Sequence, residues 1–421
     1  MNYIELNNQV IIRDENGKYQ LNKDKEALKS YLEDYIEPKM KKFDNLNDRL
    51  NYLVENDYYS KEILDLYDQY VIDVIYDFIR AKNFKFQSYM SASKFYQNYA
   101  LKSNDGEEIL ENYEDKVLIV ALTLGNGEPK LAKDIAEKLI NQEFQPATPT
   151  FLNAGRARGG KMVSCFLVNV EDSCEGISYA VSSANHLSKI GGGVALNLTR
   201  LRASGESIKG IKGAAGGVMG VAKLLEQSFS YFNQMGARQG AGAVYLNVLH
   251  PDFETLLDSK KINADEKIRL TTLSIGAIIP DKFMELAEKN EKCYAFYPHS
   301  IYQKYGVHLD GIKMDEWYDK LANDDEIEKK EINPRELLTR IAQTQQESGY
   351  PYVVFIDSAN EQHTLKDVGM IKMSNLCCEI FQYQTPSDIK GYGQVSDWGQ
   401  DISCNLGSLN IANVMDNKDI E

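Results

Sequence analysis

Asn375, Cys377 and Glu379 are three side chains that could do chemistry together, and they alternate along one short stretch. An extended backbone points alternate side chains the same way, so we expect the amide, the thiol and the carboxyl on one face. A thiol can serve as a nucleophile, a metal ligand or a radical centre, and a nearby carboxyl can move a proton. The stretch predicts either a reaction centre or an ordinary loop with a buried structural cysteine.

Two further cysteines, Cys165 and Cys404, lie in apolar stretches that we expect to be strands. They are distant in the sequence, so only the fold could bring them together, and two unrelated core thiols are the alternative interpretation. We interpret Cys174, Cys293 and Cys378 as structural. The sequence contains no Cys-x-x-Cys pair and its five histidines are scattered, so no zinc site is expected.

Glycine-rich stretches at 191–193 and 213–217 flank predicted helices. Glycine permits tight turns and close approach of a ligand, and helix N-termini attract phosphates. Neither stretch matches a P-loop or a complete dinucleotide-binding motif. Arg200 and Arg202 could hold phosphates nearby, although such charges more often form a solvated face.

The composition is that of a soluble globular protein of two to three domains, with 421 residues and a net charge of −15. The acidic balance disfavours a nucleic-acid partner. No apolar run is long enough to cross a membrane, and no signal peptide is recognisable. Six cysteines do not make a secreted disulfide scaffold, so we expect a reducing, cytoplasmic location.

Residues 1–145 have helical periodicity, clearest in an apolar stripe that predicts one long helix over 57–82. After Pro146 strands and helices alternate, which predicts a largely parallel sheet covered by helices. The expected strands are 162–170, 194–200, 243–249, 271–279, 352–357 and 403–412; the expected helices are 176–189, 215–235, 282–289 and 334–347.

Five motifs occur in a telling order: Ala-Thr-Pro-Thr at 147–150, Ser-Cys at 164–165, Gly-Gly-Gly-Val at 191–194, Asn-Leu-Cys-Cys-Glu-Ile at 375–380 and Ser-Cys-Asn-Leu-Gly-Ser at 403–408. Together they resemble the large subunit of class I ribonucleotide reductase, most closely the class Ib type. The resemblance runs over nearly the whole sequence. Its most specific part is the Asn-x-Cys-x-Glu loop combined with two cysteines in the expected strands.

The resemblance implies an α/β fold, with a helical N-terminal domain at 1–145 and the first half of a ten-stranded α/β barrel at 146–421. The predicted order of five strands, a loop and one more strand agrees with that half-barrel. The loop carrying Cys377 would be the finger inserted into the barrel. A complete member of the family continues for several hundred residues, so we expect either a fragment or an enzyme completed by a second polypeptide.

The resemblance also implies roles in the reduction of ribonucleoside diphosphates for DNA synthesis. Cys377 would be the thiyl radical that removes the 3′ hydrogen, Glu379 the general base on the 3′ hydroxyl, and Asn375 a hydrogen-bonding partner of the substrate. Cys165 and Cys404 would be the redox pair that closes a disulfide as the 2′ hydroxyl leaves as water. The implied substrate contacts are Thr148, Ser164, Cys165, Gly193, Asn375, Leu376, Cys377, Cys378 and Glu379.

Regulation and partners follow from the same resemblance. Asp172 and Arg202 match an allosteric site for a deoxynucleoside triphosphate or ATP, and residues 263–269 match the loop that passes its signal to the substrate pocket. No cofactor is expected in this chain, because a small subunit containing a metal would supply the radical. Thioredoxin or glutaredoxin would be the reductant, and a homodimer is expected. The alternative function is a nucleotide-binding or assembly module without turnover.

Overall fold

The computed structural model describes residues 1–232 and 239–416, and two compact units divide them. The first unit comprises Met1–Met162 and the residues from Asn405 onward, and the second comprises Val163–Cys404. The first unit therefore extends beyond residue 145, where the sequence places the domain boundary, and takes in a later part of the chain. Within the described residues, no helix is long and apolar enough to span a bilayer.

The first unit is helical and packs around α7 (Tyr113–Gly125), which is buried on almost every side. A two-stranded antiparallel sheet, β1 (Phe144–Pro146) with β10 (Gly407–Leu409), completes it. The remaining helices are α1 (Tyr3–Gln9), α2 (Asn22–Ser30), η1 (Tyr31–Ile36), η2 (Glu37–Lys39), α3 (Leu46–Glu55), α4 (Lys61–Leu64), α5 (Gln69–Ala81), α6 (Tyr89–Lys94), η3 (Phe95–Tyr99), α8 (Pro129–Ile140), α9 (Thr148–Asn153) and α18 (Ile411–Asp416).

The prediction of one long helix over 57–82 was wrong, because the chain breaks between α4 and α5. Tyr67 lies in the break and is almost fully buried. Its hydroxyl donates to the carbonyl of Leu122 and accepts from the amide of Gly127, each at 2.9 Å. These two bonds to the end of α7 fix Tyr67 in a position that a continuous helix would not give it.

The second unit is built on a six-stranded sheet in the order β8-β5-β4-β3-β2-β9. The first five strands in this order are parallel and β9 is antiparallel to β2. This confirms the predicted order of five parallel strands followed by one more, as in the first half of a ten-stranded α/β barrel. The strands are β2 (Cys165–Asn169), β3 (Gly193–Asn197), β4 (Gly242–Asn247), β5 (Ser274–Ile279), β8 (Tyr352–Phe355) and β9 (Ile402–Cys404).

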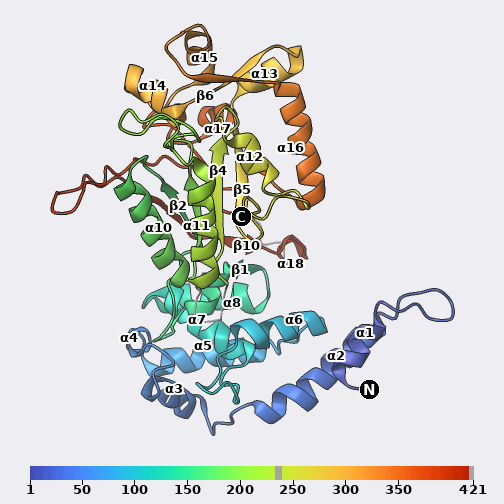
Figure 1. Ribbon diagram of the computed structural model, residues 1–421. Coiled ribbons are helices and arrows are strands. Elements are labelled where there is room, and N and C mark those ends of the chain that lie inside the picture. The colour runs from blue at the N-terminus through green and yellow to red at the C-terminus, as the bar shows by residue number, and fades with distance from the viewer. Residues whose placement is uncertain (233–238, 417–421) are drawn as a thin grey trace. The chain divides into compact units, whose positions relative to one another are not determined.

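Helices cover one face of this sheet, and Figure 1 shows α10 and α11 running along the strands. Every residue of β3, β4 and β5 is buried, as expected for parallel strands covered on both faces. The helices are α10 (Cys174–Lys189), α11 (Val218–Tyr231), α12 (Phe253–Asp258), α13 (Asp281–Lys289), α14 (Pro298–Tyr305), η4 (Leu309–Gly311), α15 (Met314–Ala322), α16 (Pro334–Ser348) and α17 (Ile356–Gln362), and a hairpin of β6 (Cys293–Phe296) and β7 (Lys329–Ile332) adjoins them.

The other face of the sheet packs against the segment that carries the predicted reaction centre. Ile371 and Met373 are buried against side chains of the strands, and Leu376 and Ile380 pack on the same cluster. The predicted finger loop therefore covers the face opposite the helices.

Two boundaries differ from the sequence prediction. The strand expected at 403–412 is split into β9 and β10, because the chain leaves β2 after Cys404 and pairs next with β1. The helix expected at 215–235 ends at Tyr231, and its predicted residues 233–235 lie outside the described residues.

Candidate active site

The segment around Cys377 is a turn, so the predicted extended ridge was wrong. The amide of Cys378 donates to the carbonyl of Asn375 at 3.1 Å, and Cys378 has a left-handed φ of 64°. Asn375 is fully buried, whereas Cys377 and Glu379 are exposed, so the three side chains do not share a face. The cause is the side chain of Asn375, which competes with extended structure for nearby backbone amides.

Asn375 is the centre of the hydrogen-bond network in this turn. Its Oδ1 accepts from the amides of Glu379 and Ile380, at 2.9 and 3.0 Å. Its Nδ2 donates to Glu379 Oε1 at 2.9 Å and to Cys165 Sγ at 3.2 Å. One buried amide thus joins the predicted base to one of the predicted redox thiols.

Cys165 and Cys404 are brought together by the pairing of β2 with β9, where they lie directly opposite each other. Both are thiols in this structure, with Cys165 buried and Cys404 partly buried. Burial and the adjacent thiol of Cys165 raise the pKa of Cys404 to about 12, so its sulfur is protonated at neutral pH. The alternative interpretation, two unrelated core thiols, is therefore wrong about where they lie, because the two cysteines are neighbours on paired strands.

Tyr245 is a residue of this site that the sequence reasoning missed. It lies on the central strand β4, is fully buried, and donates its hydroxyl to the carbonyl of Asn375 at 2.6 Å. Its ring occupies the space above Gly276, where an added Cβ would lie 2.3 Å from the ring. The pairing of a tyrosine on one strand with a glycine on the next is the signal that could have identified it.

The other predicted substrate contacts in this unit lie around the same turn. The side chain of Leu376 packs so closely on Gly193 that a Cβ there would lie 2.7 Å from Leu376 Cδ2. Cys378 donates its thiol to the carbonyl of Val353 on β8 at 3.6 Å, and burial raises its pKa. The hydroxyl of Ser164 is buried and has no hydrogen-bond partner within the described residues, so it is available to a ligand.

Thr148 belongs to the first compact unit and begins the short helix α9. Its Oγ1 lies 3.0 Å from the hydroxyl oxygen of Tyr99. The backbone carbonyl of Tyr99 in turn accepts from Arg156, which pairs with the buried Glu111 at 2.7 Å. These polar contacts hold the start of α9 within the first unit. Thr148 is therefore not among the predicted site residues that the second unit brings together around the turn at Cys377.

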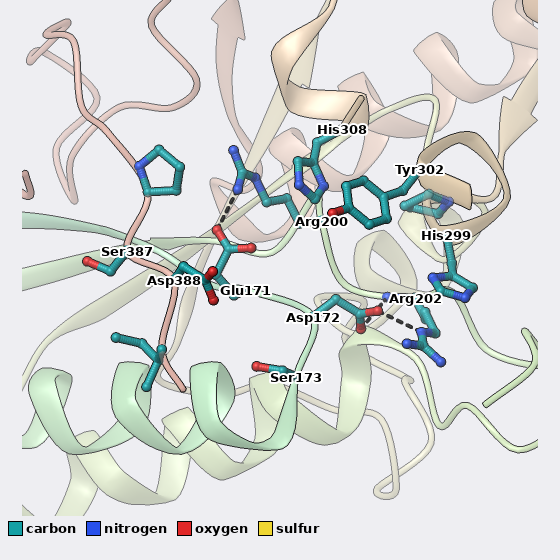
Figure 2. Close-up of a pocket in the computed structure, with 13 residues that line it drawn as sticks. Glu171, Asp172, Ser173, Arg200, Arg202, His299, Tyr302, His308, Ser387 and Asp388 are labelled. Carbon is teal, nitrogen blue, oxygen red and sulfur yellow. Dashed lines mark hydrogen bonds and ion pairs between the residues drawn. The ribbon is translucent and has the colours of Figure 1, made fainter. Parts of the chain in front are cut away.

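Asp172 and Arg202, the predicted allosteric residues, meet in a pocket of about 360 Å³ in the second unit. Arg202 Nε donates to Asp172 Oδ2 at 2.6 Å, and the Arg202 amide donates to Oδ1 at 3.1 Å. Arg200 lies beside them and pairs with Glu171, as Figure 2 shows. The pocket thus presents guanidinium groups, which suit phosphates, together with carboxylates that suit hydroxyl or amine groups.

Aromatic rings line the other wall of this pocket. The rings of Tyr302 and His308 stack with their centroids 4.5 Å apart (Figure 2). Burial and the neighbouring arginines lower the pKa of both His299 and His308, so both rings are neutral at pH 7. A flat ring system with a charged tail is the kind of ligand that such a wall and the arginines could hold together.

The described residues contain no group of three or more His, Cys, Asp or Glu side chains arranged to hold a metal ion. The turn at Cys377 does offer an exposed thiol and the carboxyl of Glu379. Asn375 joins that carboxyl to Cys165, which lies opposite Cys404. This arrangement could move a hydrogen atom, a proton and two electrons at one substrate.

Three family models together match most of the chain. The model described as "Ribonucleotide reductase, barrel domain" matches residues 163–421, "Ribonucleotide reductase, all-alpha domain" matches 85–159, and "Ribonucleotide reductase N-terminal" matches 3–84. The boundary between the first two of these matches agrees with the division between the compact units at Met162 and Val163.

Curated relatives give the same result. "Ribonucleoside-diphosphate reductase subunit alpha" of Bacillus subtilis is 52% identical over 419 residues, covering 100% of this chain and 60% of the relative. The protein of the same name from Mycoplasma genitalium is 44% identical over 98% of this chain and 56% of its own length, and that of Synechocystis sp. is 34% identical over 72% and 39%. The chain spans about 60% of the length of the Bacillus relative.

Proposed function

The chain belongs to the family of ribonucleotide reductase large subunits, and from that premise we propose that it carries the catalytic half of a ribonucleoside-diphosphate reductase. Cys377 is the radical centre, Glu379 the general base, and Cys165 with Cys404 the reductant. The observation that supports this best is the contact of one buried amide, that of Asn375, with both Glu379 and Cys165.

The reaction balances with these groups. The Cys377 thiyl takes the hydrogen atom from C3′, Glu379 takes the proton of the 3′ hydroxyl, and the 2′ hydroxyl leaves as water. The dithiol of Cys165 and Cys404 supplies two electrons and two protons, one proton for the departing water and one for the new C2′–H bond, and becomes a disulfide. Glu379 returns its proton to the 3′ oxygen, and the hydrogen atom held on Cys377 returns to C3′, which restores the thiyl and leaves a deoxyribonucleotide.

The opposed position of Cys165 and Cys404 supports their role. Residues directly opposite each other in an antiparallel pair have Cα atoms about 4.5–5.5 Å apart. A disulfide requires a Cα separation of about 4.4–6.8 Å. The bond can therefore form without a large backbone movement, which a pair that must open and close at each turnover needs.

Substrate contacts and partners are part of the same proposal. The unpartnered hydroxyl of Ser164, the backbone at Gly193 and the turn from Leu376 to Cys378 surround the proposed reacting centre. A small subunit containing a metal generates the radical, a thioredoxin-like or glutaredoxin-like protein reduces the disulfide, and the large subunit works as a homodimer in the cytoplasm.

The test is deoxyribonucleotide formation from a ribonucleoside diphosphate. The chain is combined with a polypeptide that supplies the remaining barrel strands, a small subunit and a dithiol, and the product is measured by chromatography. We expect turnover in the complete mixture and none when Cys377 is replaced by Ser. Turnover that survives this substitution would overturn the proposal.

A second function, nucleotide binding without turnover, is favoured by one observation: the Asp172–Arg202 pocket lies wholly within the second unit. We propose that a deoxynucleoside triphosphate or ATP binds there as an effector, with residues 263–269 passing the signal on. Calorimetry with deoxythymidine triphosphate tests this on the chain alone, and Arg202→Ala should abolish the binding.

A further inference from the structure

Helix α14 begins without a cap of its own. Its first residue, Pro298, has no backbone N–H, and Tyr297 before it makes no side-chain cap hydrogen bond. The next two amides, those of His299 and Ser300, have no acceptor within the helix. Glu206, which lies far away in the sequence, supplies one: its Oε1 accepts from the His299 amide at 3.1 Å and from the Ser300 amide at 3.4 Å. A carboxyl from another segment therefore caps this helix.

The other oxygen of Glu206 holds the turn from which the side chain comes. Oε2 accepts from the amide of Ala203 at 2.6 Å, and the amide of Glu206 donates to the carbonyl of Ala203 at 3.1 Å. Glu206 is only 2% exposed, so these bonds are shielded from water. One carboxyl thus joins the turn at 203–206 to the start of α14, and we name this contact the Glu206 clasp.

The Glu206 clasp connects two walls of the proposed effector pocket. Arg202 Nη1 donates to the carbonyl of Ser207, the residue that follows Glu206, at 2.9 Å. On the aromatic side, α14 carries His299 and Tyr302, which line the same pocket as Arg202 (Figure 2). The clasp therefore fixes the arginine wall and the aromatic wall relative to each other.

Glu206 is a carboxyl that titrates near neutral pH. Burial raises its pKa to about 7, the amides that it accepts from offset only part of this, and the charge of Asp172 raises the pKa further. The other titratable or charged side chains around the clasp are Tyr297, His299, Lys304, Glu326 and Glu328. Burial and the charge of Arg202 lower the pKa of His299, so this ring is neutral when Glu206 ionises.

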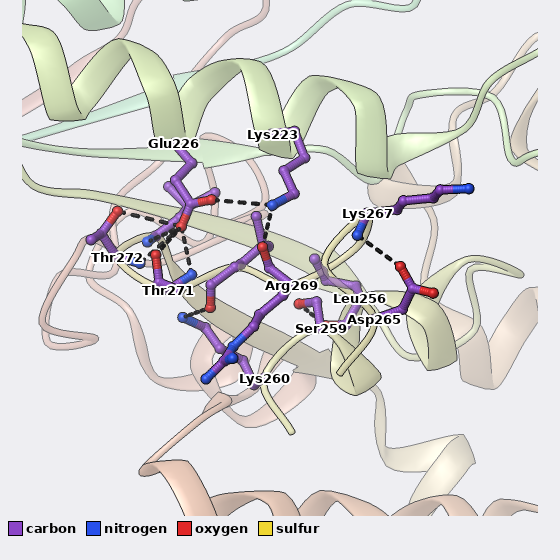
Figure 3. A network of polar contacts seen from close by, with 12 residues as sticks. Lys223, Glu226, Leu256, Ser259, Lys260, Asp265, Lys267, Arg269, Thr271 and Thr272 are labelled. Carbon is purple, nitrogen blue, oxygen red and sulfur yellow. Dashed lines mark hydrogen bonds and ion pairs between the residues drawn. The ribbon is translucent and has the colours of Figure 1, made fainter. Parts of the chain in front are cut away.

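Glu226 on α11 gives the contrasting case, shown in Figure 3. Its Oε1 accepts from the amides of Thr271 and Thr272 at 2.6 and 2.8 Å, so it also binds two consecutive backbone amides. Burial opposes its ionisation, but these bonds and the charge of Lys223, which lies 3.6 Å from Oε2, outweigh burial and lower the pKa. The carboxyls of Glu206 and Glu226 thus bind amides in the same way and differ in charge near pH 7, which makes Glu226 a matched control.

We propose that Glu206 is a positioning residue, which joins α14 to the turn at 203–206 and so sets how the arginine wall and the aromatic wall of the pocket meet a ligand. For the identity of that ligand, the inference rests on the proposed effector function. A nucleotide whose phosphates contact the arginine and whose base packs on the rings needs both walls in place at once. Opening of the Glu206 clasp separates the walls and weakens binding.

The first experiment measures the clasp in the unliganded chain at pH 6, by hydrogen–deuterium exchange at His299 and Ser300. Glu206→Ala removes the acceptor of both amides and should speed their exchange about tenfold or more. Glu206→Gln keeps one acceptor oxygen and should restore most of the protection. Glu226→Gln should leave both amides unchanged, because Glu226 binds amides of another segment. Exchange as slow in Glu206→Ala as in the unsubstituted chain would refute the clasp.

The pH profile of this exchange distinguishes Glu206 from ordinary packing. When the clasp opens, Glu206 meets water and its pKa returns towards the ordinary value of 4.5, so ionisation favours the open state as the pH rises. With a pKa of about 7 in the closed state, opening should become about tenfold more frequent from pH 6 to pH 8, after correction for the intrinsic exchange rate. Glu206→Gln cannot ionise in this range and should show no such rise. Equal profiles in the two proteins would overturn the assignment to Glu206.

Calorimetry with deoxythymidine triphosphate at pH 7 tests the effect on the pocket. Glu206→Ala should raise the dissociation constant about threefold or more, whereas Glu206→Gln and Glu226→Gln should leave it within about twofold. Faster exchange in Glu206→Ala with an unchanged dissociation constant would mean that the clasp holds α14 without setting the pocket, and would overturn the inference. Absence of binding to the unsubstituted chain would instead refute the proposed effector function, and the exchange data would still decide whether Glu206 holds α14.

Discussion

Replacing Tyr245 with Phe removes one hydroxyl from the interior of the sheet and should loosen the turn that carries Cys377. The Tyr245 hydroxyl is one of two donors to the carbonyl of Asn375, the other being the Cys378 amide at 3.1 Å. Because that carbonyl keeps one bond in the variant, the loss is that of a single buried hydrogen bond, about 1 kcal/mol. Local opening of the turn should therefore become about fivefold more frequent.

Hydrogen–deuterium exchange at Cys378, Glu379 and Ile380 measures this opening directly, because all three amides donate to Asn375. Tyr318→Phe is the matched control: Tyr318 is also a buried tyrosine of the second unit, and its hydroxyl accepts from the Tyr294 amide at 2.9 Å. The control should lower global stability to a similar degree without affecting the three amides. The reasoning would be refuted if these amides exchanged equally fast in Tyr245→Phe and in the unsubstituted chain. It would also be refuted if both variants lost the same amount of protection at these amides.

Three further predictions concern the thiols. Cys377→Ser should abolish reduction in the completed enzyme and leave the thermal unfolding curve unchanged, since the side chain is exposed; activity near that of the unsubstituted enzyme would refute the radical role. One turnover without added reductant should remove two thiols, and peptide mapping should link Cys165 to Cys404; a different pair would exclude the proposed reductant. The raised pKa of Cys404 means that its thiolate fraction is small near neutrality and grows about tenfold per pH unit below pH 12. Alkylation of Cys404 by iodoacetamide should therefore keep accelerating from pH 8 to about pH 11, whereas a plateau near pH 9 would contradict the raised pKa; the exposed Cys174 gives the reference rate.

The architecture of the second unit could be predicted because parallel strands buried on both faces are continuous apolar runs. The segments 243–249 and 271–279 correspond to β4 and β5, with their limits shifted by at most three residues. The position of the finger loop after the fifth parallel strand also followed from the order of the elements. Both predictions needed only the apolar runs and their order along the chain, which can be read directly from the sequence.

The conformation of the finger loop could not be predicted in the same way. The alternation rule applies to an extended chain, but the side chain of Asn375 captures the amides of Glu379 and Ile380 and turns the chain back. The break at Tyr67 has a similar origin, because its partners, Leu122 and Gly127, lie far along the sequence. In both cases side-chain hydrogen bonds determine the backbone path, and the periodicity of apolar residues does not reveal such bonds.

The thiol pair shows how strongly the site depends on strand register. Cys165 faces Cys404 because Leu167 pairs with Ile402 two residues away, and both of these apolar side chains are buried in the cluster beneath the finger loop. A shift of β9 by one residue would put Ser403 opposite Cys165 and turn the thiol of Cys404 to the other face. The same shift would expose Ile402, so burial of one apolar side chain in a very short strand stabilises the register that the proposed redox chemistry requires. The spacing of Ile402 and Cys404 therefore serves both the packing of the sheet and the proposed reduction step.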